Sequence, residues 1–259
     1  MNSELRGQTV PLQAAVIGAG PAGLMAAEAL AQAGVSVHVF DAMPSAGRKF
    51  LLAGRGGLNL THSEPLDRFV ARLRPQVPAL EGMVRAFSPE ALRAWAAGLG
   101  IATFVGTSGR VFPTDMKATP LLRAWLHRLR AAGVTFHMRH RWQGWDEAGR
   151  LRFDSPDGPR LVASQAQVLA LGGGSWARLG SDGAWVPVLQ AAGVEVQPLQ
   201  PSNCGFDATG GWTPFFTERH AGQPFKSVAI AFGGQRKKGE FVATATGVEG
   251  SLVYAFSAD

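Results

Sequence analysis

Apolar and polar positions along the chain follow two periods, one typical of helices and one typical of strands. The clearest helix is predicted over Pro120–Ala132, where apolar side chains return every three or four residues and form one stripe. The segment that follows, Val134–Met138, alternates apolar and polar residues as a half-buried strand does. A third segment, Ser63–Gly98, has a helical composition that several prolines interrupt. The pattern therefore predicts a chain that mixes helices and strands.

One joint between these two kinds of segment recurs four times. An Ala- or Leu-rich segment ends in glycine and leads directly into an apolar, mostly β-branched run. Glycine at such a joint ends a helix in the left-handed conformation, and the next residues begin a strand. The four glycines are Gly34, Gly100, Gly133 and Gly193. Helices that alternate with short strands predict an α/β fold, here a Rossmann-like domain with a mainly parallel sheet.

The composition changes after Pro198, where Gly, Pro, Phe and Thr dominate and strand-like segments appear. Two such segments are Ser227–Phe232 and Glu240–Thr244. We therefore expect two domains, a Rossmann-type domain over residues 1–194 and a partial, strand-rich second domain over residues 195–259 that serves as a substrate or cap domain.

The first predicted strand ends at Ile17 and leads into the sequence Gly-Ala-Gly-Pro-Ala-Gly and an alanine-rich helix. In a dinucleotide-binding turn, the first glycine permits the tight turn and the second lets the backbone approach a pyrophosphate. The third lets the helix pack closely on the strand. The helix N-terminus offers free N–H groups and a partial positive charge to the phosphates. The candidate cofactor-binding residues in this turn are Gly18, Gly20, Pro21, Ala22 and Gly23.

A second predicted strand ends at Asp41, which Ala42 follows. A carboxylate at this place accepts hydrogen bonds from the adenosine ribose hydroxyls, so both residues are candidates for cofactor binding. The negative charge of Asp41 also opposes a 2′-phosphate and disfavours NADP at this site. The alternative is a glycine-rich turn without a ligand, but the context of strand, helix, second strand and acid favours the dinucleotide site.

Four stretches of the chain carry a resemblance to a known family: Val16–Asp41, Gly47–Thr61, Gly109–Pro113 and Val168–Gly173. They resemble the two-dinucleotide-binding-domain flavoproteins, and more closely the BaiN-like (YhiN-type) flavoprotein family, over nearly the whole chain. The resemblance implies an FAD-dependent oxidoreductase with non-covalent FAD in a Rossmann-type domain. It also implies NAD(P)H as the reductant. Because only one complete nucleotide fingerprint is present, NAD(P)H would bind transiently at the flavin rather than on a second Rossmann unit.

In that family, the second of these stretches lies along the pyrophosphate and the flavin. Two cations there would oppose two phosphates, whereas the alternative is an exposed basic turn. The last stretch corresponds to the segment where the chain returns beneath the cofactor, and the backbone near Trp142 to the part that holds the adenine. By this resemblance, the further cofactor-binding residues are Arg48, Lys49, Asn59, Thr61, Trp142, Leu171, Gly172 and Gly173.

The sequence departs from the family in three respects. A Cys-Asn pair is usual where this chain has Leu58-Asn59, and Leu171 replaces a common threonine. Family members are also longer than 259 residues. The resemblance therefore implies that this chain lacks the C-terminal segment that returns to the flavin, which leaves open a nucleotide-binding remnant without activity.

The net charge of +6 favours anionic partners, but the basic residues are scattered. The single run, residues 236–238, has glycine-rich flanks and is expected in a solvated loop. Nucleic-acid binding is therefore not expected, although an FAD-dependent tRNA-modifying protein stays open as an alternative. A small-molecule substrate is the expected partner.

Other chemistries find little support in the sequence. The single cysteine, Cys204, excludes a disulfide relay, and the six histidines show no metal-ligand spacing, so no metal is expected. The segment Gly173–Ala177 lacks the last glycine of a nucleophile elbow. Glycines and a proline interrupt the apolar stretch over residues 14–33, so we expect no membrane span there. The polar segment Met1–Thr9 lacks the layout of a signal peptide, and the single cysteine fits a cytoplasmic location. No residue is nominated as a catalytic acid or base.

Overall fold

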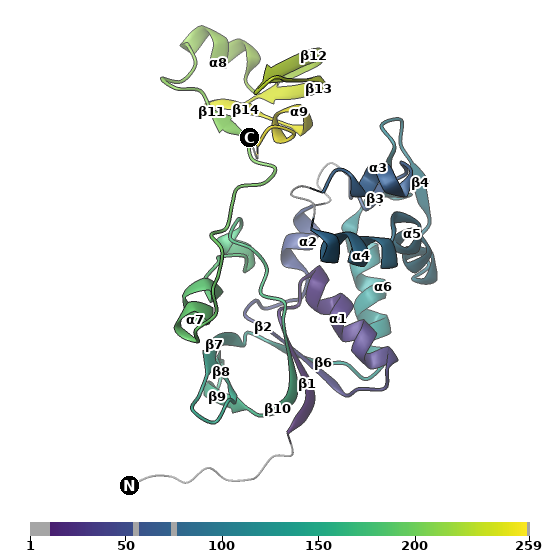
Figure 1. The fold of residues 1–259 in the computed structure, drawn as a ribbon, viewed down its shortest axis with the longest axis vertical. Helices are drawn as coiled ribbons and strands as arrows, with labels where there is room; N and C mark the ends of the chain where they lie inside the picture. Colours follow the sequence, from purple (N-terminus) through teal and green to yellow (C-terminus); the bar gives the residue numbers. More distant parts are fainter. Residues whose placement is uncertain (1–10, 54–56, 74–76, 258–259) are drawn as a thin grey trace. The chain divides into compact units, whose positions relative to one another are not determined.

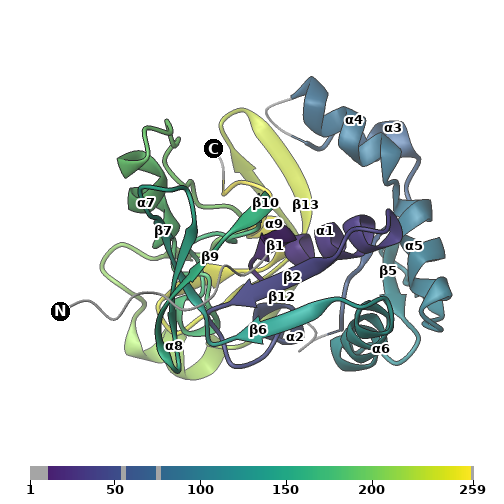
Figure 2. The same ribbon diagram turned by 90° about the horizontal axis from the view of Figure 1, so that it is seen from below.

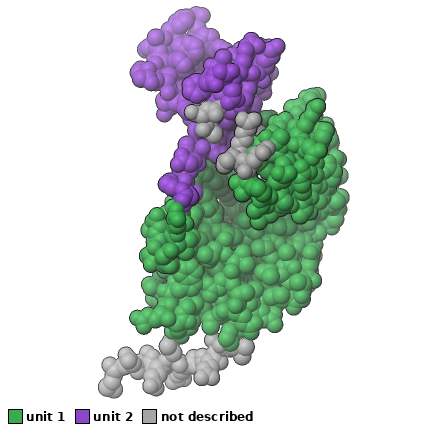
Figure 3. All heavy atoms as spheres, viewed as in Figure 1, with its two compact units in different colours: residues 1–196 green, residues 197–259 purple. Residues whose placement is uncertain are grey.

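The computed structural model describes residues 11–53, 57–73 and 77–257. The chain divides into two compact units, residues 1–196 and residues 197–259 (Figure 3). This division concerns compactness alone. The assignment of residues 1–194 to an FAD-binding domain and of residues 195–259 to a substrate domain therefore stays a prediction.

A four-stranded parallel sheet forms the centre of the first unit, with the strand order β10-β1-β2-β6. Strand β1 lies inside the sheet, and its Ala15 and Val16 are fully buried. Helix α1 connects β1 to its parallel neighbour β2, as a parallel pair requires. The predicted α/β class with a Rossmann-like parallel sheet is confirmed. The bounds are β1 Leu12–Ile17, α1 Pro21–Gln32, β2 Val37–Asp41, β6 Thr135–Met138 and β10 Ser164–Leu169.

Helices cover one face of this sheet, and a small antiparallel sheet covers the other (Figure 1, Figure 2). On the helical face, the apolar stripe of α6 buries Leu121, Trp125 and Leu129 against α1 and the sheet. On the other face, Phe40 of β2 packs with Phe153. On the helical face, α1 is joined by α5 Pro89–Gly98 and α6 Ala118–Ala131. The elements on the other face are β7 Arg141–Trp145, β8 Leu151–Ser155, β9 Gly158–Val162 and α7 Trp185–Ala191.

The remaining elements of the first unit are short. Three strands form a small antiparallel sheet with the order β3-β5-β4. In the described part of the predicted helical stretch between Ser63 and Gly98, three helices occur, and each begins at a proline or directly after one. The bounds are α2 Arg48–Leu52, β3 Thr61–His62, α3 Leu66–Val70, α4 Pro78–Ala86, β4 Thr103–Val105, β5 Arg110–Pro113 and η1 Ala177–Leu179.

The second unit is built around an antiparallel sheet with the order β11-β14-β13-β12. An aromatic group holds α8 to this sheet, because Phe216 of the helix lies against Trp212 and Phe225. The predicted strand-rich character of this region is confirmed. The bounds are β11 Phe206–Asp207, α8 Pro214–His220, β12 Pro224–Phe232, β13 Gln235–Ala243, β14 Gly247–Glu249 and α9 Ser251–Tyr254.

The four glycine joints are only partly as predicted. All four glycines have a φ between 78° and 84° and follow a helix. The joints at Gly34 and Gly133 lead into the parallel sheet, whereas the joint at Gly100 leads into β4 of the antiparallel sheet. No strand follows Gly193 before β11. Val194, the first residue of this run, is 47% exposed, and none of the described strands pairs with the run.

The basic run over residues 236–238 was expected in a loop, and this expectation is wrong. Gly233 and Gly234 form the turn, and pairing between β12 and β13 begins immediately after them at Gln235. The basic residues therefore lie in β13. Within the strand, the Lys237 ammonium donates to the Ala255 carbonyl at 2.6 Å.

Candidate cofactor site

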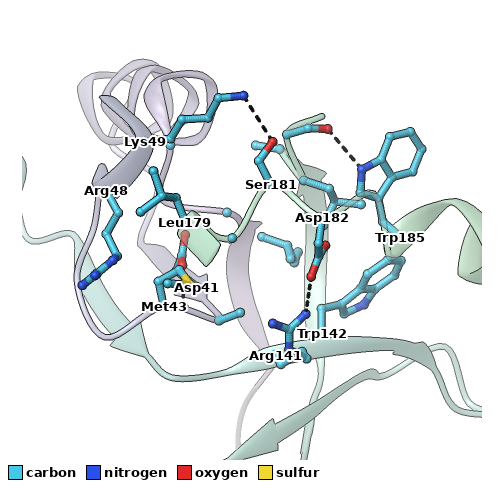
Figure 4. A pocket seen from close by; sticks show the side chains of 18 of the residues that line it. Asp41, Met43, Arg48, Lys49, Arg141, Trp142, Leu179, Ser181, Asp182 and Trp185 are labelled. Carbon is cyan, nitrogen blue, oxygen red and sulfur yellow. Dashed lines mark hydrogen bonds and ion pairs between the residues drawn. The ribbon is translucent and has the colours of Figure 1, made fainter. Parts of the chain in front are cut away.

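A cavity of about 500 Å³ lies where β1, β2 and β10 end. Five segments line it: the turn after β1, the end of β2, the start of α2, strand β7, and the segment from β10 to α7 (Figure 4). All of its lining residues belong to the first unit. The carboxyl ends of parallel strands are the place where open α/β sheets bind their ligands. The cavity therefore has the position expected of a nucleotide site.

The three glycines of the turn after β1 have different roles. A Cβ atom on Gly18 would lie 2.2 Å from the Ala170 carbonyl oxygen, and φ at Gly18 is +110°. A Cβ atom on Gly23 would lie 1.8 Å from the Gly18 carbonyl oxygen. At Gly20, which lines the cavity, no atom lies within 4 Å of an added Cβ. The fold thus requires glycine at positions 18 and 23, whereas Gly20 keeps open space for something outside the protein.

Asp41 connects this turn to the chain that follows β2. One carboxylate oxygen accepts a hydrogen bond from the Ala19 amide at 2.6 Å, and the other accepts one from the Met43 amide at 2.7 Å. Burial raises the pKa of Asp41, while the two backbone donors and the Arg141 charge act in the opposite direction. Each carboxylate oxygen has a further lone pair, so Asp41 is able to accept additional bonds from hydroxyl groups of a ligand.

Two cations at the start of α2 line the cavity without an acidic partner. In the described part of the chain, neither Arg48 nor Lys49 forms an ion pair, and the buried Arg48 Nε has no hydrogen-bond partner. The Lys49 ammonium donates only to serine hydroxyls, at 2.7 Å to Ser175 and 3.4 Å to Ser181. Two positive charges that the protein leaves uncompensated favour an anionic ligand.

Aromatic and polar side chains of β7 and α7 line the opposite wall (Figure 4). Trp142 is only 8% exposed, and its indole N–H has no partner among the described residues. Arg141 Nη1 lies 3.0 Å from Asp182 Oδ2, and the Trp185 indole donates to the Gly172 carbonyl at 3.1 Å. These two contacts hold the segment between β10 and α7 against the cavity.

Most residues predicted from the sequence meet at this cavity. Those that line it are Gly18, Gly20, Pro21, Asp41, Ala42, Arg48, Lys49, Trp142, Leu171, Gly172 and Gly173. Ala22 and Gly23 lie in the first turn of α1 and do not line it. The structure does not bring Asn59 or Thr61 to the cavity, because Asn59 is exposed elsewhere and Thr61 pairs with Val111 in the β3–β5 sheet. Their contact with a cofactor stays a prediction.

Several cavity residues were not identified from the sequence. The glycine- and serine-rich composition of residues 172–183 predicts a loop, but it does not indicate where that loop lies. Arg141 and Asp182 are 41 positions apart, so nothing local marks them as a pair. The additional lining residues with polar or aromatic side chains are Phe40, Ser45, Phe50, His140, Arg141, Gln143, Ser181, Asp182 and Trp185.

The described ranges contain neither a candidate metal site nor a helix suited to span a membrane. No cluster of three or more His, Cys, Asp or Glu side chains has an arrangement suited to a metal ion there. Within the same ranges, every helix is too short or too polar to span a membrane.

The comparison with protein families assigns the chain to one of them. The model of the HI0933-like protein Rossmann domain matches residues 12–254. The chain belongs to this HI0933-like family. The match covers most of both units, and with it the whole cavity. Among curated proteins, none matches the chain.

Solved structures with a similar fold are distant in sequence. The chain is similar to the open conformation of a flavocytochrome c3 fumarate reductase, at 19% identity and a TM-score of 0.51 over 64% of this chain and 34% of that one. It matches Thermovibrio ammonificans THI4 at 18% identity and a TM-score of 0.45, over 71% of this chain and 64% of that one. Aklavinone-11 hydroxylase, in complex with FAD and aklavinone, matches at 20% identity and a TM-score of 0.38, over 66% of this chain and 35% of that one. The chain thus spans less than two thirds of each of these proteins.

Proposed function

We propose that this protein is an FAD-dependent oxidoreductase that binds FAD non-covalently in the cavity of its first unit. One observation carries the proposal. At the end of β1, the backbone at Gly20 faces open space, and two cations without acidic partners line the same cavity. A dinucleotide has a pyrophosphate with two negative charges, and this arrangement is suited to such a group.

The residues present fit FAD at each part of the cavity. The N–H groups that begin α1, together with Arg48 and Lys49, would hold the pyrophosphate. Asp41 would accept hydrogen bonds from the ribose hydroxyls, and the unpartnered indole N–H of Trp142 leaves a donor for the adenosine part. FAD, when bound, supplies the hydride-transfer chemistry, and the protein contributes orientation and electrostatics.

Family membership and fold support the same function. The resemblance to BaiN-like flavoproteins extends along the sequence, and the chain belongs to the HI0933-like family. A flavocytochrome c3 fumarate reductase has a similar fold, and aklavinone-11 hydroxylase was solved with FAD. We propose NAD(P)H as a transient reductant that reaches the flavin directly, because the sequence has one complete dinucleotide fingerprint.

The proposal is tested by reduction of the purified, FAD-loaded protein under anaerobic conditions. Addition of NADH or NADPH is expected to bleach the visible flavin bands, and a subsequent electron acceptor is expected to restore them. A protein that takes up FAD but is reduced by neither nicotinamide would contradict the NAD(P)H assignment. A protein that takes up no FAD would contradict the proposed function as a whole.

A further inference from the structure

Two serines from a distant part of the chain hold the Lys49 side chain. The ammonium donates to Ser175 Oγ at 2.7 Å and to Ser181 Oγ at 3.4 Å, across 126 and 132 positions of sequence. Figure 4 shows the bond to Ser181, which links α2 to the segment between β10 and α7. Ser175 is exposed, whereas Ser181 is only 5% exposed and lines the cavity. Ser175 thus makes the shorter bond, whereas Ser181 is the buried acceptor of the two.

The backbone fixes Ser181 in place. Its amide donates to the Trp176 carbonyl at 3.2 Å, and its carbonyl accepts from the Trp176 amide at 3.0 Å. Its hydroxyl lies against a glycine pair, since a Cβ atom on Gly172 or Gly173 would lie 3.7 or 3.9 Å from Oγ. The hydroxyl thus occupies a defined position between this glycine pair and Lys49.

The chemistry of the contact leaves the charge of Lys49 available. A serine hydroxyl accepts a hydrogen bond from the Lys49 ammonium and leaves its positive charge unchanged. A carboxylate partner would instead offset most of the electrostatic potential of that charge. A lysine side chain is long and flexible, so an uncompensated lysine at a cavity normally has no fixed position. Two serine acceptors restrain the side chain and leave the third N–H of the ammonium for another acceptor.

We propose that Ser181, assisted by Ser175, is a positioning residue that holds the Lys49 ammonium at the cavity for a phosphate oxygen of the cofactor. The inference rests on the proposed function, because it takes the pyrophosphate of FAD as the anion. In this arrangement the two serines do not contact the cofactor themselves, and they affect FAD binding by fixing the position of the Lys49 ammonium.

A double-mutant cycle on the full chain tests this inference, with FAD affinity measured by flavin fluorescence. Ser181→Ala is expected to weaken FAD binding about twofold, because a 3.4 Å hydrogen bond to an exposed ammonium contributes little energy. Lys49→Met is expected to weaken it about tenfold. In the Lys49→Met background, Ser181→Ala is expected to have no further effect, because the group that it positions is absent.

Two further measurements separate positioning from general stability. Ser175→Ala changes an exposed residue, and we expect a loss of affinity about twofold in size that also disappears in the Lys49→Met background. In each serine variant, the dependence of the dissociation constant on salt is expected to weaken towards that of Lys49→Met, with an unchanged unfolding temperature. A loss of stability without a change in salt dependence would assign Ser181 a structural role and overturn the inference.

The remaining outcomes also decide the question. Additive losses in the double variant, or no loss in Ser181→Ala while Lys49→Met weakens binding, would overturn the positioning role and leave the proposed function intact. Full FAD affinity in Lys49→Met would overturn the anion subsite itself. Failure of the unaltered chain to take up FAD would overturn both the inference and the proposed function.

Discussion

The first unit has a buried carboxylate at one site and two cations, half-buried Arg48 and exposed Lys49, at another, and it treats their charges in opposite ways. On the helical face, Glu28 of α1 is 5% exposed and, besides Gln32 of its own helix, has three partners on other helices. It accepts hydrogen bonds from the indoles of Trp125 at 2.7 Å and Trp95 at 3.0 Å, and Arg128 Nη2 lies 2.6 Å away as an ion pair. At the cavity, Arg48 and Lys49 have no such acidic partner in the described ranges.

The presence or absence of an oppositely charged partner distinguishes the structural site around Glu28 from the binding site around Arg48 and Lys49. Burial of a charge is unfavourable unless a partner compensates it. The partners of Glu28 come from α5 and α6, so this charge is compensated inside the protein and joins three helices. The cations at the cavity are not compensated, and the folded chain keeps them beside open space. We infer that their partner is a ligand.

The largest effect is expected from Gly20→Val. No atom lies within 4 Å of an added Cβ, and φ at Gly20 is −78°, which valine adopts without strain. The side chain would occupy pyrophosphate space, so FAD affinity should fall more than about 1,000-fold while the unfolding temperature stays unchanged. Flavin titration and thermal unfolding measure the two quantities.

The smaller variant Gly20→Ala supplies the matched control for this result. Its loss of affinity should lie between those of the unaltered chain and Gly20→Val, because less space is filled. Normal FAD content in Gly20→Val would remove the turn after β1 from the site.

The converse result is expected from Glu28→Ala. The free energy of unfolding should fall by about 3 kcal/mol, because two indole N–H groups and a guanidinium lose a buried carboxylate. Denaturant unfolding measures this loss, and the FAD affinity of the folded protein should not change. A loss below about 0.5 kcal/mol would mean that the Glu28 network does not stabilise the fold.

A third effect, of intermediate size, is expected from Arg48→Met. FAD affinity should fall about tenfold with a weaker salt dependence, because one cation opposite the pyrophosphate is removed. The free energy of unfolding should stay constant or rise, since the buried Nε has no partner to lose. Arg152→Met, at an exposed position of β8, is the control and should change neither quantity. If Arg48→Met lowers the free energy of unfolding and leaves FAD affinity unchanged, Arg48 stabilises the fold and does not bind the cofactor.

The smallest effect concerns pH. Burial, with smaller contributions from Arg160 and two neighbouring histidines, lowers the pKa of His137 to about 4 from an ordinary value of 6.5. As the pH falls through this window, the unfolded chain takes up the proton before the folded chain does. The contribution of neutral His137 to stability is therefore complete above pH 6.5 and is lost progressively towards pH 4.

Unfolding curves measured between pH 7 and pH 4 check this expectation. His137→Phe should flatten the acid branch of the stability profile, whereas His127→Gln, at an exposed position of α6, should leave it unchanged. An acid branch that is identical in His137→Phe and in the unaltered chain would contradict the role of His137.

The sequence predicted those parts of the molecule that short-range chemistry determines. The glycine spacing after β1 is such a case, because Gly18 has a positive φ within the turn and the clash at Gly23 is with Gly18 of the same βα unit. The helix over Ala118–Ala131 is another, since its apolar stripe is local. Most cavity residues predicted by resemblance also lie together, although Asn59 and Thr61 do not line the cavity.

The remainder depends on contacts between distant positions. The pairing of Arg141 with Asp182 and of Lys49 with Ser181 spans 41 and 132 positions, and no local pattern marks either pair. The strand expected after Gly193 fails to form for a related reason, because a β-branched run needs a neighbouring strand to complete its hydrogen bonds. Likewise, pairing across the hairpin places the 236–238 run in β13, although its flanking glycines suggest a loop.

The most direct test of the account is an equilibrium titration of the unaltered chain with FAD, followed by visible absorption. The account predicts saturable uptake of one FAD per chain, with a shift of the flavin bands and competition by ADP. Flavin bands that stay identical to those of free FAD throughout the titration would contradict it, because the cations that line the cavity with Gly20 would then bind no dinucleotide.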